Sequence, residues 1–318
     1  MSLVEKAIEK LRAGGDAARK HVAAPPPVVA KVVNAAVPAY RARDSRPDLP
    51  PYNPNKLVKV DRSALSVLGL LPPADQEREL MDQYRAIKRP LLRAAFHSER
   101  TEGPSPQLVM IASALPGDGK TFTCLNLAFS MAREKDHSVL LVDADVIKPH
   151  VSRLFGVDKE PGLLDLLANP DLDPRSLILP TDIPGLTFLP AGTAAENATE
   201  LLASARMREV VAQLSAMDPS RVVLLDTLPI LLTSESRVLA TLVGQIVLVV
   251  KAGVTPQHAV ADALSAIGEG KSVSLVLNQA ELTGPMGYYY GYRYGYEQQE
   301  KGQTQDAVDD KARAANGV

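Results

Sequence analysis

A glycine-rich stretch near the middle of the chain has the composition of a phosphate-binding loop. It reads Ala114-Leu115-Pro116-Gly117-Asp118-Gly119-Lys120-Thr121, between an apolar run and a helical pattern that begins near Phe122. Glycines let backbone N–H groups close around phosphate oxygens, and a helix N-terminus adds positive potential. Lys120 is expected to reach the terminal phosphates of a nucleotide, and the Thr121 hydroxyl to bind Mg²⁺. The strand–loop–helix context disfavours a chance Gly-Lys-Thr, so the sequence predicts a nucleotide site at Pro116, Gly117, Asp118, Gly119, Lys120, Thr121 and Phe122.

Three aspartates end two other apolar runs. Asp143 and Asp145 close the run at 138–142, and Asp226 closes the run at 222–225. Because the carboxyl ends of parallel strands line the ligand crevice of a sheet, these side chains are expected beside the phosphate loop. There they can hold the waters of Mg²⁺ or accept a proton from an attacking hydroxyl. For Asp143 and Asp145 the alternative is a loop with a capping aspartate.

Asn278 is a further candidate, because it follows the apolar run at 273–277. It either reads the edge of an adenine or is an ordinary turn asparagine. Lys251 similarly faces either a nucleotide or solvent. Cys124, the only cysteine, is interpreted as a small core residue.

The most unusual stretch is a cluster of tyrosines near the end of the chain, six of them within 288–296. Polar, glycine-spaced sequence surrounds them, so their hydroxyls have no core to enter. With a nucleotide loop upstream, the hypothesis is that the chain phosphorylates its own tail. The alternative is a sticky low-complexity segment. The candidate acceptors are Tyr288, Tyr289, Tyr290, Tyr292, Tyr294 and Tyr296.

The elements that would position these residues form an α/β pattern. Apolar runs alternate with helical patterns, as expected for a mainly parallel, doubly wound sheet with helices on both faces. A helix from Asp75 to about Phe96 is expected before this sheet. Pro90 should either kink this helix or end its first part. We therefore predict one P-loop domain over 75–283. The strands are expected at 108–112, 138–142, 186–189, 222–225, 246–250 and 273–277.

The two ends of the chain have different compositions. Residues 1–15 fit a short amphipathic helix, residues 16–74 a flexible linker rich in Pro and Ala, and residues 284–318 a tyrosine-rich tail. The net charge of -2 gives no electrostatic reason to bind nucleic acid. With one cysteine, no signal peptide and no run long enough to span a bilayer, a soluble cytoplasmic protein is expected.

Together these residues resemble the bacterial tyrosine kinases, which use Walker motifs instead of the eukaryotic kinase fold. Ala114–Thr121 corresponds to Walker A, Val142–Pro149 to the second Asp-x-Asp motif and Leu224–Pro229 to Walker B. The segments 189–202, 249–256 and 276–278 and the tyrosine cluster also match the family. Met1–Gly14, with Ile87–Leu92 and Asp143–Arg153, resembles the subgroup encoded beside exosortase and exopolysaccharide loci.

The resemblance implies a mechanism and partners. Mg²⁺ would be held by Thr121, Asp145 and Asp226, Lys120 would stabilise developing charge, and Asp143 would accept the proton of the incoming tyrosine. The tail of one subunit would enter the site of its neighbour in a homo-oligomeric ring. A membrane-spanning polysaccharide chain-length determinant, or co-polymerase, would activate the kinase and hold it at the inner membrane, and a phosphotyrosine phosphatase would reverse the reaction.

Some residues depart from the family pattern. The ring-assembly motif Glu-x-x-Arg-x-x-Arg is represented by Asp82, Arg85 and Lys88, which keep the charges but not the bidentate guanidinium. Ile147 stands where the family often has Arg. Two rivals remain open: a partition or positioning ATPase, which would carry lysine at Leu115, and an ATP-binding regulatory scaffold of a polysaccharide-export complex without kinase activity.

Overall fold

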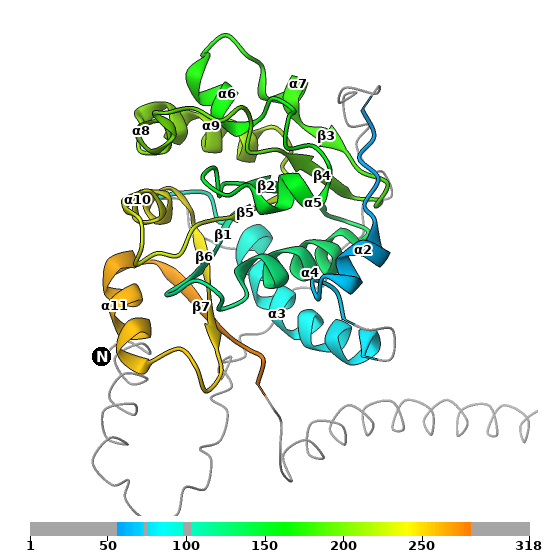
Figure 1. The fold of residues 1–318 in the computed structure, drawn as a ribbon, viewed down its shortest axis with the longest axis vertical. Helices are drawn as coiled ribbons and strands as arrows, with labels where there is room; N and C mark the ends of the chain where they lie inside the picture. Colours follow the sequence, from blue (N-terminus) through cyan, green and yellow to red (C-terminus); the bar gives the residue numbers. More distant parts are fainter. Residues whose placement is uncertain (1–55, 73–75, 98–102, 281–318) are drawn as a thin grey trace, which may run out of the picture. The chain divides into compact units, whose positions relative to one another are not determined.

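A seven-stranded sheet forms the centre of the computed structural model, which describes residues 56–72, 76–97 and 103–280. Its strand order is β3-β4-β2-β5-β1-β6-β7. All neighbouring strands are parallel except β3 and β4. The predicted mainly parallel α/β fold is therefore confirmed (Figure 1). The strands are β1 Leu108–Ser113, β2 Ser138–Asp143, β3 Leu179–Pro180, β4 Leu186–Leu189, β5 Arg221–Asp226, β6 Gln245–Lys251 and β7 Ser272–Asn278.

The six predicted apolar runs all form strands, and the side chains of most of these strands are buried on both faces of the sheet; the exception is β7, at the edge. β1 and β5 are buried along their whole length. The strand that the sequence did not predict is β3, which has two residues and pairs antiparallel with β4. Two residues, one of them proline, are too few to produce a hydrophobic period.

Helices cover the sheet in two layers. One core joins the sheet to α2 (Arg62–Val67), α3 (Glu77–His97), α4 (Lys120–Ala132) and α5 (His150–Leu154). The other core joins the opposite face to the remaining helices. These are α6 Leu163–Ala168, α7 Pro174–Leu177, α8 Ala198–Leu202, α9 Ala205–Ala216, α10 Ser234–Leu242 and α11 Gln257–Ile267. None of the helices in the described ranges is long and apolar enough to cross a membrane.

The predicted linker over 16–74 is too long at its C-terminal end. Residues 56–72 belong to the folded domain, with Val58, Val60, Leu65 and Leu71 in the core that also contains α3 and α4. The Val58 amide donates to the carbonyl of Pro180 at 2.9 Å, so this segment lies against β3. The sequence interpretation extended the linker because of the prolines upstream, and it overlooked the alternating apolar residues Val58 and Val60. The predicted helix at 1–15, the remaining linker up to residue 55 and the tail at 284–318 lie outside the described residues.

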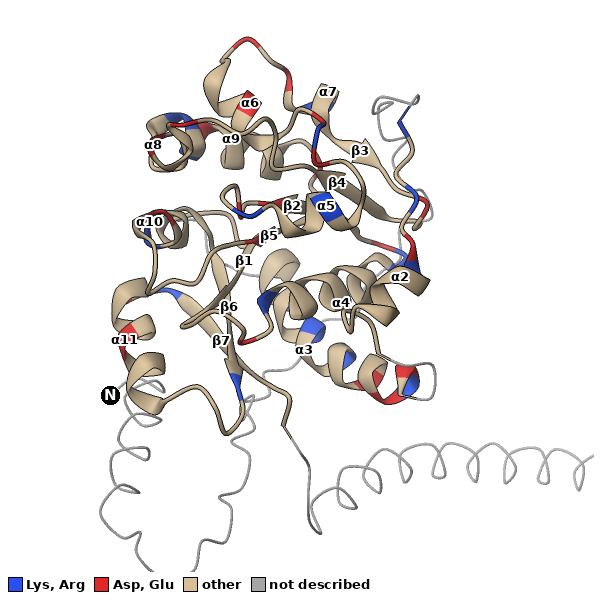
Figure 2. Ribbon diagram, in the orientation of Figure 1, with Lys and Arg blue, Asp and Glu red and all other residues tan. Residues whose placement is uncertain are grey.

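The helix that precedes the sheet, α3, continues past Pro90, where the sequence predicted either a kink or the end of its first part. It runs from Glu77 through Pro90 to His97, so Pro90 does not end it. The side chains that it buries are Tyr84, Lys88, Leu91 and Ala95. This stripe packs α3 against α4. Charges of both signs lie along α3 (Figure 2).

The three charges on α3 that were predicted to assemble a ring are not equivalent. Asp82 and Arg85 are exposed and pair with each other at 2.6 Å. Lys88 is only 7% exposed, and its ammonium donates to the carbonyl of Ser130 at 2.6 Å and pairs with Glu134 at 2.7 Å. Lys88 thus ties α3 to α4 within one chain, and its predicted part in oligomerisation stays a prediction.

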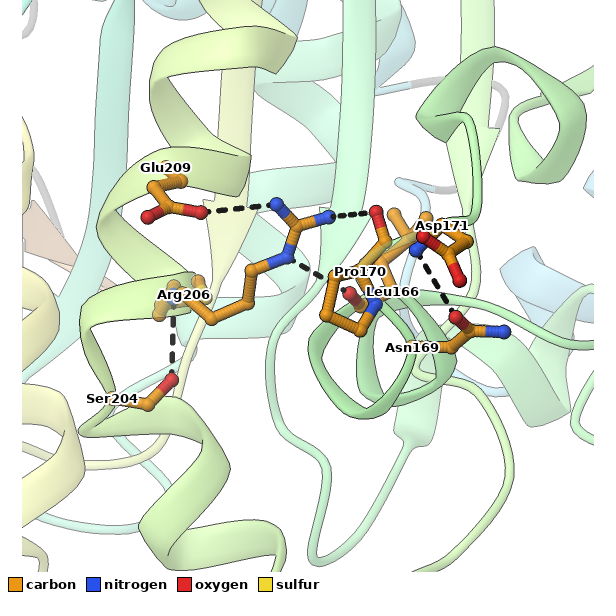
Figure 3. Close-up of polar contacts among 8 residues, drawn as sticks. Leu166, Asn169, Pro170, Asp171, Ser204, Arg206 and Glu209 are labelled. Carbon is orange, nitrogen blue, oxygen red and sulfur yellow. Dashed lines mark hydrogen bonds and ion pairs between the residues drawn. The ribbon is translucent and has the colours of Figure 1, made fainter.

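Arg206 joins two helices on the opposite face of the sheet. Its guanidinium, at the start of α9, donates to the carbonyls of Leu166 and Pro170 at 3.4 and 3.2 Å and pairs with Glu209 at 3.0 Å. Figure 3 shows this fork between α9 and the end of α6. Because the last carbonyls of a helix lack partners within the helix, a cation there is favourable. Arg206 thereby holds α6 and α9 together as one layer.

The position of Lys88 can be tested by stability measurements. Lys88→Met keeps the apolar stem but removes the donor, so the free energy of unfolding should fall by about 1–3 kcal/mol. Arg85→Met, which removes an exposed ion pair, should change it by less than about 0.5 kcal/mol. Urea unfolding of the two variants beside the wild type measures both. Equal effects would show that Lys88 is not held within the chain.

Candidate nucleotide site

The phosphate loop connects β1 to α4 and depends on two glycines. Gly117 and Gly119 have φ angles of +81° and +98°, a region that favours glycine. At Gly119 a side chain would also meet Asn278, because an added Cβ would lie 2.0 Å from the Asn278 Nδ2 atom. Lys120 begins α4 directly after this turn. The loop therefore places Lys120 and Thr121 at a helix N-terminus, as the motif requires.

Asp118 stabilises the phosphate loop through buried hydrogen bonds. This residue is 3% exposed, and its carboxylate accepts hydrogen bonds from the Leu115 amide at 3.0 Å and the Thr255 hydroxyl at 2.6 Å. The Asn278 side-chain amide donates to the Asp118 carbonyl at 2.9 Å. Residues that follow β6 and end β7 thus fix the shape of the loop after β1. In this structure Asn278 supports the loop, and its predicted contact with adenine stays a prediction.

Two carboxylates face the loop from neighbouring strands. Asp143 and Asp226 are register partners at the carboxyl ends of β2 and β5, where Figure 2 shows acidic residues. The Thr121 hydroxyl donates to Asp226 Oδ2 at 2.9 Å. Ser152 donates its amide and its hydroxyl to Asp143 Oδ2, both at 2.8 Å. In each carboxylate the Oδ1 atom is buried and has no hydrogen-bond partner among the residues that the structure describes.

Burial perturbs both of these carboxyl groups. It raises the pKa of Asp226 from 3.8 to about 7, and the neighbouring charge of Asp143 raises it further, against the effects of Lys120 and Thr121. Burial also raises the pKa of Asp143 to about 6, against its two hydrogen bonds from Ser152. Burial also raises the pKa of half-buried Asp145. The hydrogen bond from the Lys148 amide and the charge of Lys120 oppose this rise. Lys120 thus lies within electrostatic range of Asp145 and Asp226.

This arrangement fits a divalent cation bound together with phosphates. Two buried carboxylate oxygens without partners, on groups that repel each other, are stabilised by positive charge. No group of three or more His, Cys, Asp and Glu side chains that could hold a metal occurs in the described part of the chain. Mg²⁺ does not need such a group, since it commonly keeps several waters and uses one or two protein carboxylates plus substrate phosphates. Thr121, Asp145 and Asp226 remain the predicted ligands.

The structure brings most of the predicted site residues to one edge of the sheet. Lys120, Thr121, Asp143, Asp145 and Asp226 gather at the carboxyl ends of β1, β2 and β5. Asp82 and Arg85 lie elsewhere, on α3. The six tail tyrosines lie outside the described residues.

Sequence reasoning missed two supporting residues, Ser152 and Thr255. Both hold a carboxylate of the site, and Ser152 also accepts a hydrogen bond from the Ala191 amide at 3.0 Å. Both lie in stretches that resemble the bacterial tyrosine kinases. Hydroxyl residues are common in loops, however, so nothing in their type indicated these contacts.

Comparisons with known proteins point to one group. A model of the ParA family, described as NUBPL iron-transfer P-loop NTPase, matches residues 106–218. The chain is 30% identical over 279 residues to EpsB of Ralstonia solanacearum, a protein assigned as a tyrosine-protein kinase, across 80% of this chain and 36% of EpsB. It is 30% identical over 240 residues to the tyrosine-protein kinase YwqD of Bacillus subtilis, across 74% of this chain and 96% of YwqD. The chain thus matches little more than a third of EpsB but almost all of YwqD.

A solved structure agrees with these sequence matches. The kinase domain of the Escherichia coli tyrosine kinase ETK superposes with a TM-score of 0.54 at 30% identity. The superposition covers 64% of this chain and 78% of that domain.

The buried charge of Asp226 should make stability depend on pH. A carboxyl group with a raised folded-state pKa contributes fully below its unfolded pKa, and that stability is lost as the pH rises through the folded-state value. The free energy of unfolding of the nucleotide-free protein should therefore fall between pH 5 and pH 8. The fall amounts to about 1.4 kcal/mol for each pH unit between pH 5 and the folded-state pKa of about 7.

Asp226→Asn tests this origin of the pH dependence. The variant keeps an acceptor for Thr121 and removes the charge, so it should be more stable than wild type at pH 8 and show a smaller fall from pH 5. Chemical denaturation at both pH values measures this. Asp82→Asn, on an exposed carboxylate, should leave the pH dependence as it is. A slope unchanged in Asp226→Asn would contradict the argument.

Proposed function

The chain belongs to the bacterial tyrosine-protein kinases, and on that basis we propose that it is an ATP-dependent autokinase of its own tyrosine cluster. The observation that carries the proposal is the meeting of Lys120 and Thr121 with the buried carboxylates of Asp143 and Asp226. A phosphate loop alone would serve any nucleotide hydrolase or switch. The six tyrosines within 288–296 supply acceptors on the same chain.

The proposed reaction is phosphoryl transfer from ATP to a tyrosine hydroxyl. The phenol oxygen forms a bond to the γ-phosphorus while the bond to the bridging oxygen breaks, and ADP leaves. Lys120 stabilises the charge on the transferring group and on the leaving phosphate. Mg²⁺, when bound with the nucleotide, neutralises phosphate charge; Thr121, Asp145 and Asp226 are the residues that we expect to hold it.

Asp143 is the proposed acceptor of the phenol proton. A free tyrosine has a pKa near 10, so a base beside it helps. Burial raises the pKa of Asp143 to about 6, which makes it a stronger base than an ordinary aspartate. Ser152 occupies one of its oxygens and leaves the other available. Because Asp143 has no exposed surface in this structure, the acceptor must displace what covers it.

The proposal extends to partners and place. The tail of one copy is expected to enter the site of another within a ring. Six phosphotyrosines would add roughly -10 in charge to each chain, against a starting -2, and so would loosen the ring by repulsion. We propose a membrane-spanning polysaccharide co-polymerase as activator, a cytoplasmic position at the inner membrane through that partner, a phosphatase that resets the tail, and a role in exopolysaccharide production.

Mass spectrometry of the purified protein with Mg-ATP tests the kinase assignment. Stepwise phosphate additions should map to 288–296. They should disappear in Lys120→Met and in a variant with all six tail tyrosines changed to Phe. Arg62→Met, which removes an exposed ion pair with Glu77, serves as a handling control and should be phosphorylated like the wild type. No incorporation, with and without the cytoplasmic part of a candidate co-polymerase, would favour the scaffold or positioning ATPase instead.

The pH profile of the reaction tests the proposed base. Since a base works only when deprotonated, kcat/KM for tail phosphorylation should rise with pH through the region of about 6 to 7, where burial sets the pKa of Asp143 and Asp226. Asp143→Asn should lower kcat by about 100-fold or more, a typical contribution of general base catalysis, and should still bind nucleotide. Retention of the wild-type rate would exclude Asp143 as the base.

A further inference from the structure

The strand at one edge of the sheet, β7, carries exposed apolar side chains. Its only neighbour in the described part of the chain is β6, and its seven residues pair with β6 from end to end, without a bulge. Leu275 and Leu277 are 55% and 52% exposed. Among the large exposed apolar side chains of the described residues, these two are the ones that lie on a strand. Figure 1 shows β7 with α11 beside it and no further strand drawn.

Proteins usually protect such an edge with lysine, proline, a bulge or a covering element. β7 has none of the first three, since its sequence is Ser-Val-Ser-Leu-Val-Leu-Asn. The leucines, two residues apart, project to the same side of the strand. An unprotected strand of this length is a template for an added strand. A partner that fits this edge would have an extended backbone and apolar or aromatic side chains at every second position.

The tyrosine segment 288–296 has this pattern. Tyr288, Tyr290, Tyr292, Tyr294 and Tyr296 alternate with Tyr, Gly, Arg and Gly. In an extended strand those five rings would share one face, and tyrosine is a residue that favours strands. Nine residues match the seven of β7 with little overhang. Arg293 is the segment's one charged side chain, so charge does not oppose pairing.

We propose that segment 288–296 of a second copy adds to β7 as an eighth strand and so links copies head to tail. Backbone hydrogen bonds would hold the strand, and its tyrosine rings would cover Leu275 and Leu277. Cross-strand aromatic and aliphatic pairs of this kind contribute about 0.2–1 kcal/mol each. Because each copy carries one edge and one segment, the contact is heterologous, and repeated contacts close into a ring when the rotation permits.

Two further observations favour this contact. Lys88 is buried and bonded to α4 and Glu134 of its own chain, so its ammonium is not presented on the outer face of α3. In addition, Asn278 at the end of β7 contacts the phosphate loop, so one end of an added strand lies at the nucleotide edge of the sheet. A tail held on β7 is thereby kept beside a nucleotide site.

Phosphorylation should release the added strand; this step rests on the proposed kinase activity, whereas the docking does not. Tyrosines on one face of a strand are about 6.7 Å apart, and each phosphate carries about -1.5 to -2 in charge. Phosphorylation would place these charges beside each other and against the two leucines. Repulsion and desolvation both oppose that state.

The test uses the full chain, treated with phosphatase and kept free of nucleotide, so that its result is independent of catalysis. Sedimentation velocity should show oligomers, and hydrogen exchange should show protection of residues 272–278 that increases with protein concentration. Leu275→Lys with Leu277→Lys should weaken association at least tenfold. The control, Leu232→Lys with Val254→Lys, changes apolar residues that are 60% and 63% exposed in loops and should associate like the wild type.

A matched pair of tail variants tests the partner strand. Tyr289→Pro with Tyr292→Pro removes the donors of two residues of opposite parity, so one of the lost N–H groups faces β7 in either register; this variant should not associate, whereas Tyr289→Phe with Tyr292→Phe should. Mixing the proline variant with the leucine variant should give a dimer, because one intact edge and one intact segment remain.

Three results would overturn the proposal. They are unchanged exchange of 272–278 in the proline variant, protection that does not depend on protein concentration, and failure of the two variants to complement. If the tail is still phosphorylated in Mg-ATP under those results, the kinase assignment stands and this docking site alone fails.

Discussion

The repulsion between two buried carboxylates is the constraint around which the site is organised. Parallel pairing of β2 with β5 puts Asp143 and Asp226 directly opposite each other, on strands about 4.8 Å apart. Burial raises the pKa of each, and each charge opposes the other. Such a pair is costly in the empty protein and becomes favourable when a cation and the phosphate loop share the space. Under the proposed function, nucleotide binding would thereby be coupled to the stability of the central sheet.

The surroundings of this pair are consistent with that coupling. Ser152 and Thr121 each satisfy one oxygen of a carboxylate and leave the other without a partner in the described structure. Asp118, in contrast, is satisfied on both oxygens and serves the loop. The same residue type thus has two roles, and the hydrogen-bond partners distinguish them. A structural aspartate is fully bonded within the chain, whereas the catalytic candidates keep an atom free.

Much of the fold could be predicted from the sequence, because it depends on local periods. Strands buried on both faces appear as continuous apolar runs, and the glycines of the phosphate loop identify the turn between β1 and α4. The missed features depend on contacts between distant residues. β3 is too short to have a period, and the docking of residues 56–72 depends on β3. Lys88 has the same charge whether it faces solvent or the carbonyl of Ser130, so its type could not indicate that it is buried.

The burial of Lys88 bears on how copies of the chain could assemble, because its ammonium is bonded within its own chain. A charge motif on an exposed helix can hold copies together only with side chains that are free to reach a neighbour, and here Asp82 and Arg85 pair with each other. The exposed surface with the more specific geometry is the edge of β7, where backbone groups and two leucines are presented in a regular array. Assembly through the segment that carries the acceptor tyrosines would make the substrate and the contact the same object. Phosphorylation would then act on the contact directly, without any movement transmitted through the domain.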